Sequence, residues 1–141
     1  MGEGDNTPIR VLIADDHQMM RTGLRAVLEG EPGIEVVGEA EDGRTAVTLA
    51  AELSPHVVVM DINMPHLNGV EATRQVTSNG AGTKVVVLSG HSDGKLVSEV
   101  LRAGASGYVL KDSAFEELPV SLRAVAAGKT YVSPRVANEM E

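Results

Sequence analysis

The chain has 141 residues, which suits one domain large enough to bury most of its apolar surface. It contains no cysteine, so disulfides and thiolate metal sites are excluded and a reducing compartment fits. Twelve basic and twenty acidic residues give a net charge of −8, and the chain therefore lacks the basic surface of a nucleic-acid binder. No apolar run approaches the length of a membrane span, so we expect a cytoplasmic protein without membrane contacts.

Residues 1–8 are polar and lack the apolar run of a signal peptide or anchor, so we expect a flexible lead-in. Beyond them, short runs rich in Val, Ile and Leu alternate with longer segments of helical period. Five strands are predicted, at residues 9–14, 33–40, 56–60, 84–88 and 107–110. This alternation is typical of an α/β domain whose parallel sheet is covered by helices on both faces.

A helix is predicted after each strand, from apolar residues that recur at helical spacing. Asp42 is placed to cap the second helix. In the last helix, Ser113 with Glu116 matches a capping box, and Pro119 lies beyond the first turn, which predicts a kink or a late start. The apolar stripe of that helix is predicted to contain Phe115, Leu118, Leu122 and Val125.

The five strand and helix pairs predict a (βα)5 domain over residues 9–130, with a doubly wound, flavodoxin-like parallel sheet of strand order 2-1-3-4-5. Polar residues follow four of the strands at the same end of the sheet: Asp15, Asp16, Asp61, Ser89 and Lys111. Ligands of such sheets bind beyond the carboxyl ends of the strands, where the strand order reverses. Here that point lies between strands one and three, so we expect the three carboxylates to meet there.

Three carboxylates in one pocket repel one another unless a cation is present. Mg²⁺ suits such a site, because it favours carboxylate oxygens, waters and phosphate oxygens as ligands. Lys111 supplies a positive charge for an anionic group, and Ser89 supplies a hydroxyl donor. Carboxylates, Mg²⁺, a lysine and a hydroxyl together indicate phosphoryl transfer, in which catalysis is mostly positioning and charge neutralisation.

Each of these residues also has a simpler interpretation. Asp16 alone is explained as the N-cap of the first helix, and Asp61 alone as a turn residue before "INMP". Lys111 alone would be a solvated lysine, and Ser89 a loop hydroxyl. Their coincidence at matching strand ends favours a functional site over four independent accidents.

Four segments, in order, resemble the signature blocks of the receiver domains of two-component response regulators. They are "IADDHQMMRTGL", "VVVMDINMPHLNGVEA", "VVVLSGHSD" and "RAGASGYVLKD". The resemblance covers residues 9–130, and the early "DDH" with the late "GKTYVSP" is most similar to the NarL/FixJ-type subfamily. Domains of this family accept a phosphoryl group from a histidine kinase, with Mg²⁺ as cofactor, and are signalling proteins rather than enzymes acting on other substrates.

The resemblance implies a role for each matched residue. Asp61 would be the phosphoacceptor and a metal ligand, with Asp16 binding Mg²⁺ directly and Asp15 chiefly through water. The backbone carbonyl of Asn63 would be a further metal ligand.

Three other residues would respond to the phosphoryl group. Lys111 would contact it, Ser89 would be the switch hydroxyl, and Tyr108 would be the switch aromatic that turns inward. The family often has proline after its lysine, in a cis bond, whereas this chain has Asp112, for which we expect a trans bond.

Two further functions share parts of this pattern. A phosphohydrolase with an aspartate nucleophile would carry a second aspartate two residues on, where this chain has Asn63. A flavodoxin-like FMN carrier would have a phosphate loop rich in Ser and Thr after strand one, where this chain has "DDHQMM". The histidines at 17, 56, 66 and 91 have no zinc-ligand spacing and are predicted to be loop and helix-start residues.

The resemblance also implies partners. Besides the histidine kinase, the family suggests a homodimer that forms on phosphorylation. Residues 131–141 are similar to the start of the linker that, in this subfamily, leads to a helix-turn-helix domain, through which DNA would be bound. The alternative is a free-standing receiver in a phosphorelay.

Overall fold

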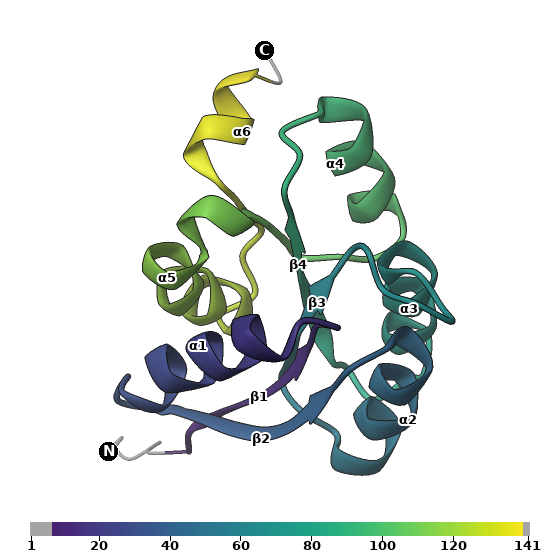
Figure 1. Ribbon diagram of the computed structural model, residues 1–141, viewed down its shortest axis with the longest axis vertical. Coiled ribbons are helices and arrows are strands. Elements are labelled where there is room, and N and C mark those ends of the chain that lie inside the picture. The colour runs from purple at the N-terminus through teal and green to yellow at the C-terminus, as the bar shows by residue number, and fades with distance from the viewer. Residues whose placement is uncertain (1–6, 140–141) are drawn as a thin grey trace.

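A parallel sheet lies between two layers of helices in the computed structural model, which describes residues 7–139 (Figure 1). The residues 1–6 of the predicted lead-in lie outside the described part of the chain. The strands are β1 (Ile9–Ala14), β2 (Ile34–Ala40), β3 (Val57–Asp61), β4 (Lys84–Ser89), β5 (Gly107–Leu110) and β6 (Tyr131–Val132). The helices are α1 (Gln18–Glu29), α2 (Gly43–Leu53), α3 (Gly69–Thr77), α4 (Gly94–Arg102), α5 (Ala114–Ala126) and α6 (Pro134–Glu139).

The strand order is β2-β1-β3-β4-β5-β6, and every pair is parallel. The predicted order of the first five strands is therefore confirmed, and the order reverses between β1 and β3. The sixth strand was not predicted, because two residues are too short for a periodic pattern. This strand, β6, lies beside β5 at the edge of the sheet. The Tyr131 N–H donates to the Ser106 carbonyl (3.0 Å), and the Ser133 N–H donates to the Tyr108 carbonyl (2.9 Å).

Residues 131–139, predicted to begin a linker, thus form β6 and α6 against the domain. Side-chain hydrogen bonds hold these residues in addition to the backbone hydrogen bonds. The hydroxyls of Tyr131 and Ser133 donate to the Glu117 carboxylate of α5, at 3.0 and 2.6 Å. Burial, and then the negative charge of Glu117, raise the pKa of Tyr131 to about 12.

Two apolar clusters, one on each face of the sheet, form the core. Helices α1 and α5 cover one face, and α2, α3 and α4 cover the other (Figure 1). All five residues of β3 are buried, as its uninterrupted apolar run predicts, because this central strand meets helices on both sides. None of the helices in the described part of the chain combines the length and apolar character needed to cross a membrane.

The start of α5 differs from the prediction. Lys111–Ser113 form a 3-10 turn that leads into the helix, so Ser113 is not extended and its side chain makes no capping bond. The helix begins at Ala114 and runs through Pro119, so no late start occurs. Phe115 is 47% exposed and is therefore not buried in the predicted stripe.

Other local predictions are confirmed. The Asp42 side chain accepts the Thr45 N–H at 2.8 Å, which caps α2. The 7–139 segment contains no cis peptide bond, so the bond before Asp112 is trans. Leu118, Leu122 and Val125 are buried as the α5 stripe predicts.

Candidate functional site

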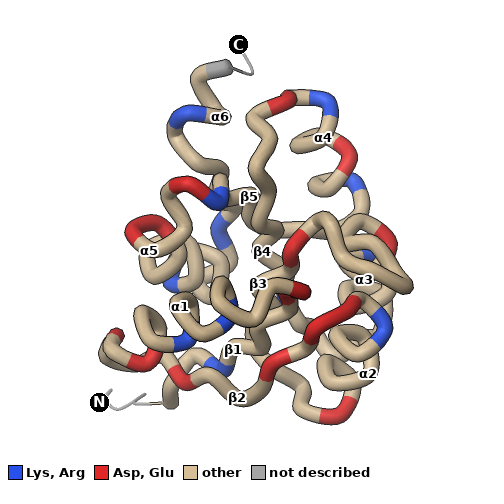
Figure 2. Tube along the Cα trace, in the orientation of Figure 1, with Lys and Arg blue, Asp and Glu red and all other residues tan. Residues whose placement is uncertain are grey.

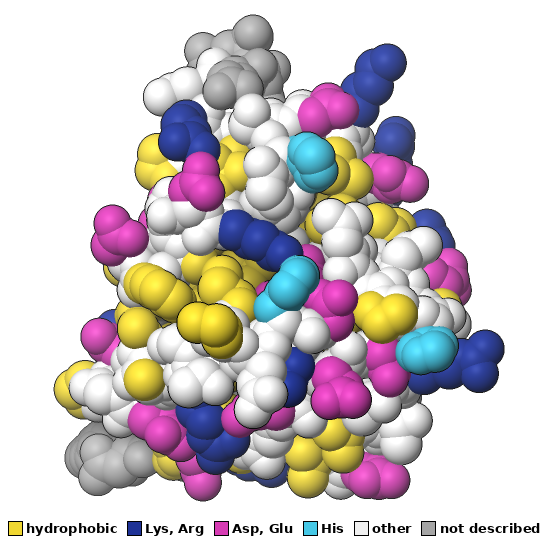
Figure 3. Space-filling model, viewed as in Figure 1, with side chains coloured by type: hydrophobic (Ala, Val, Ile, Leu, Met, Phe, Trp, Pro, Cys, Tyr) yellow, Lys and Arg dark blue, Asp and Glu magenta, His cyan; other side chains and the backbone are white. Residues whose placement is uncertain are grey.

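Three carboxylates and an imidazole meet at the point where the strand order reverses. Each of Asp15, Asp16, His17 and Asp61 offers one ligand atom, and these atoms lie within 4.8 Å of one another. Asp15 and Asp61 are fully buried, whereas Asp16 and His17 are exposed. Figure 2 shows acidic positions at the ends of β1 and β3, and Figure 3 shows acidic, basic and histidine side chains together near the centre of this face.

Asp61 ends β3 with its side chain directed at two donors. Its Oδ1 lies 2.9 Å from the Lys111 Nζ and accepts the Asn63 backbone N–H at 3.1 Å. The bond to Asn63 is the turn contact that the simpler interpretation of Asp61 expects, so the residue shapes the turn and also lies in the site. Its Oδ2 is buried and has no hydrogen-bond partner within residues 7–139.

Burial raises the pKa of Asp61 above its usual range. The ion pair with Lys111 and the Asn63 amide act against this shift, while the negative charge of Asp15 adds to it. Because one lysine faces a group of three carboxylates, the site as folded is short of positive charge.

Asp15 follows β1 and is held by the first turn of α1. Its Oδ1 accepts the His17 backbone N–H at 2.8 Å and lies 3.1 Å from the His17 Nδ1. The Arg21 guanidinium donates to the Asp15 carbonyl at 2.6 Å. His17, rather than Asp16, is the N-cap residue of α1, so the simpler interpretation of Asp16 as the cap is wrong.

His17 and Arg21 were not predicted to belong to the site. The signal for His17 is its place directly after two aspartates, whereas the spacing of the four histidines relative to one another gives none. Arg21 gave no local signal, because its contact to Asp15 depends on how α1 turns back over the end of β1.

The chemistry of the donor set fits a hard divalent cation. Buried polar atoms in proteins are nearly always paired, so two unpaired carboxylate oxygens in one pocket point to a missing positive partner. The Oδ2 atoms of Asp15 and Asp61 are both of this kind. Carboxylate oxygens are the ligands that Mg²⁺ prefers.

Ser89 and Tyr108 lie on neighbouring strands and both contact His91. The Ser89 Oγ accepts the His91 backbone N–H at 3.0 Å, and the Tyr108 hydroxyl donates to the His91 carbonyl at 2.6 Å. Both side chains are fully buried. Burial raises the pKa of Tyr108, against the effect of the Ser89 hydroxyl.

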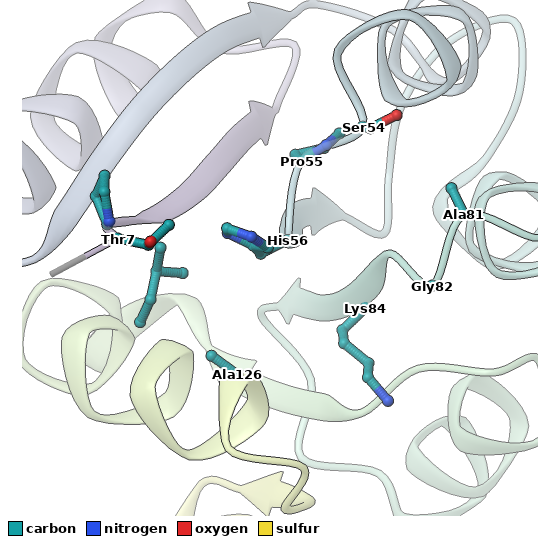
Figure 4. Close-up of a pocket in the computed structure, with 10 residues that line it drawn as sticks. Thr7, Ser54, Pro55, His56, Ala81, Gly82, Lys84 and Ala126 are labelled. Carbon is teal, nitrogen blue, oxygen red and sulfur yellow. The ribbon is translucent and has the colours of Figure 1, made fainter. Parts of the chain in front are cut away.

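A hollow of about 320 Å³ lies at the opposite end of the sheet, by the starts of β1 and β4 (Figure 4). His56 and Lys84 line it together with Ser54 and small or apolar residues, and none of its lining residues is acidic. The His56 Nδ1 accepts the Arg10 N–H at 2.9 Å, so this histidine supports the strand pair instead of the carboxylate site.

A doubly wound sheet with three carboxylates and a lysine at its switch point defines a domain suited to hold a cation beside an anionic group. Residues 11–123 match the response regulator receiver domain. The chain belongs to this family, and it is therefore a receiver domain of the two-component signalling type.

Its relatives include whole transcription regulators. The chain is 45% identical to the transcriptional regulatory protein DegU of Brevibacillus brevis over 94% of its own length and 56% of that protein. It is 44% identical to the transcriptional regulatory protein LiaR of Bacillus subtilis, over 94% of the chain and 63% of that protein. The chain thus spans less than two thirds of the length of these relatives.

Solved structures resemble the whole domain. A LuxR-family two-component response regulator from Aurantimonas sp. SI85-9A1 has a TM-score of 0.90 and 36% identity, over 95% of this chain and 96% of that one. The isolated receiver domain of RcsB from Salmonella enterica serovar Typhimurium, with the phosphomimetic BeF3−, has a TM-score of 0.86 and 30% identity, over 96% and 100%. The LuxR-family description of the first structure is consistent with the NarL/FixJ-type resemblance of the sequence.

Proposed function

We propose that Asp61 is the phosphoacceptor in a Mg²⁺-dependent transfer from the phosphohistidine of a histidine kinase. The proposal rests on the arrangement of the Asp61 carboxylate. Its Oδ1 lies 2.9 Å from the Lys111 Nζ, and its Oδ2 has no hydrogen-bond partner in the described chain. A carboxylate oriented in this way needs no further activation to attack phosphorus.

In the proposed transfer, an Asp61 oxygen forms a bond to phosphorus while the phosphorus–nitrogen bond of the phosphohistidine breaks. The electron pair of that bond stays on the histidine nitrogen. Lys111 stabilises the phosphoryl oxygens by its charge. Asp15, Asp16, Asp61 and the Asn63 carbonyl would hold Mg²⁺, which when bound neutralises charge on the carboxylates and the phosphoryl group.

The proposed switch uses Ser89 and Tyr108. The family resemblance predicts that Tyr108 turns inward on phosphorylation, but its side chain is already buried here. We infer that the moving part is the segment around His91, because both residues hold its backbone. When the Ser89 hydroxyl turns to a phosphoryl oxygen, it releases the His91 amide and shifts the population of conformers of the loop before α4.

The proposed output is control of a DNA-binding domain that follows Glu141. The relatives named as transcriptional regulatory proteins are longer than this chain, which supports this proposal over a free-standing phosphorelay receiver. A homodimer on phosphorylation is supported by exposed apolar side chains on α1 and α5. Met19 is 89% exposed, and the Phe115 ring packs over Gly23, one helical turn from Met19. Figure 3 shows hydrophobic side chains gathered over α1 and α5.

Replacement of the phosphoacceptor tests the proposal. Asp61→Asn should take up no phosphate from acetyl phosphate or a phosphohistidine donor with Mg²⁺, because the amide oxygen is a poor nucleophile. Uptake is measured as a mass increase of the intact protein. The matched control is Asp112→Asn, which changes an exposed carboxylate next to Lys111 and should leave uptake unchanged.

Labelling of Asp61→Asn at the wild-type rate would show that the phosphate goes elsewhere and would refute the assignment. The phosphohydrolase alternative has its own readout. Steady release of phosphate from a monoester such as p-nitrophenyl phosphate would favour it, whereas the asparagine at position 63 predicts no turnover.

A further inference from the structure

The carboxylate cluster contains one nitrogen donor, and its position is set by the start of α1. The His17 Nδ1 lies 3.1 Å from an oxygen of Asp15 and 3.1 Å from an oxygen of Asp16. The imidazole nitrogen is therefore placed between two of the three proposed metal ligands.

The placement of His17 is enforced by the backbone. Its N–H donates to the Asp15 Oδ1 at 2.8 Å, and its carbonyl accepts the Arg21 N–H at 3.0 Å in the first turn of the helix. Although His17 is the N-cap residue, its ring makes no capping bond to the helix. The backbone bonds fix where the side chain begins, and the contacts of the ring to Asp15 and Asp16 place it over the cluster.

The interior of the cluster independently points to a cation. The Oδ2 atoms of Asp15 and Asp61 are buried and lack hydrogen-bond partners in the described chain. Both residues belong to the set of four whose ligand atoms lie within 4.8 Å of one another, and the fourth member is His17. A cation bound by the two buried carboxylates would therefore have the His17 Nδ1 within reach.

We propose that His17 is a nitrogen ligand of this site and makes it prefer Zn²⁺ and Ni²⁺ to Mg²⁺. The inference rests on the proposed function, in which these carboxylates hold the cation of phosphoryl transfer. Mg²⁺ favours oxygen ligands and retains its waters, whereas imidazole suits Zn²⁺ and Ni²⁺. The nitrogen adds affinity for the later transition ions and little for Mg²⁺.

Such a preference would make occupancy of the site depend on which ions are available. Zn²⁺ or Ni²⁺ bound by the same carboxylates excludes Mg²⁺, so the two kinds of ion compete. Replacement of the Asp61 carboxylate should weaken the binding of both kinds of ion. Replacement of the His17 ring should weaken only the binding of Zn²⁺ or Ni²⁺.

The test is a measurement of dissociation constants by calorimetry at pH 7.5, with Ni²⁺ and Mg²⁺ as separate probes. His17→Ala should weaken Ni²⁺ binding by at least about tenfold and change Mg²⁺ binding by less than about threefold. The matched control is His91→Ala, an exposed histidine outside the cluster, which should bind both ions as the wild type does. Thermal melts of both variants verify that each is folded.

A second measurement uses the unaltered protein. With ¹⁵N-labelled histidine, saturating Zn²⁺ should move the Nδ1 resonance of one ring, and that resonance should be the one missing in His17→Ala. Unchanged Ni²⁺ affinity in His17→Ala, an equal loss for Ni²⁺ and Mg²⁺, or a Zn²⁺-shifted ring other than His17 would overturn the inference. None of these results affects phosphate uptake by Asp61 with Mg²⁺, which is the separate test of the proposed function.

Discussion

The buried Asp61 carboxylate is costly to the fold when it is ionised, and its neighbours hold it in place. Burial raises its pKa, so the stability it contributes is present below its unfolded pKa and is lost as the pH rises through the folded pKa. The ionised Asp61 carboxylate therefore opposes folding, and the contact with Lys111 offsets only part of this cost. The proposed phosphoryl transfer requires this ionised carboxylate, because its oxygen attacks phosphorus.

The first prediction concerns this shortage of positive charge. Millimolar Mg²⁺ should raise the melting temperature by a few degrees, because the ion binds the folded cluster and not the unfolded chain. The measurement is a thermal melt with and without MgCl2, with NaCl of equal ionic strength as the control. Asp16→Ala should reduce the rise. An equal rise with NaCl would mean that general screening, and not a site, stabilises the protein.

The start of α3 lies directly against the end of β3, beside the site. Gly69 opens α3 and donates its N–H to the Ile62 carbonyl at 2.9 Å. A Cβ at this position would collide with the carbonyl of Asp61. The glycine therefore lets the helix start directly against the residue that carries the reactive carboxylate.

The second prediction follows from this contact. Gly69→Ala should lower the free energy of unfolding by about 1–3 kcal/mol, because the new methyl group displaces backbone that cannot yield. Urea denaturation measures the change. The control is Gly30→Ala at the end of α1, where a Cβ meets its nearest atoms at 3.6 Å and where φ is −80°. This variant should be neutral or slightly stabilising.

The third prediction concerns the contact between α1 and β2. The Glu39 carboxylate accepts from Arg25 at 2.8 Å and from Arg21 at 3.1 Å. The bond from Arg25 is the main cause that lowers the pKa of Glu39, and burial acts against it. A lowered pKa gives stability that is present above the unfolded pKa and is lost as the pH falls through the folded pKa.

Glu39→Gln should therefore cost up to about 1 kcal/mol at pH 7, and the cost should be smaller at pH 3. Denaturation at the two pH values measures this difference. The control is Glu35→Gln, an exposed position of β2 that forms no ion pair with any described residue, and it should show no such dependence. A cost that stays constant with pH would mean that packing, not charge, explains the contact.

At the scale of the whole molecule, the net negative charge disfavours contact with DNA. A net charge of −8 repels the phosphate backbone, so we expect this domain not to bind DNA by itself. We expect the chain to show no shift of a DNA fragment in a mobility assay at 150 mM salt. A longer form that includes the segment after Glu141 is the matched comparison, and it should bind if the proposed output domain is present. Binding by the present chain alone would contradict the prediction.

Much of the architecture could be predicted from the sequence, because it depends on local periodicity. The buried run of β3 and the polar residues that end β1, β3, β4 and β5 predict a site at one end of the sheet. Strand β6 escaped prediction, since two residues carry no period and their place depends on Glu117, which lies 14 residues from Tyr131.

The sequence by itself determined the fold, the family and the identity of the carboxylates, because strand ends and signature blocks are properties of the chain order. Tertiary structure decided which groups reach those carboxylates. The 2.9 Å pair of Lys111 with Asp61, the unpaired Oδ2 of Asp15, and the His17 ring over the cluster all depend on how separate strand ends and α1 come together. Distances between residues far apart in the chain are set by packing, which no local pattern records.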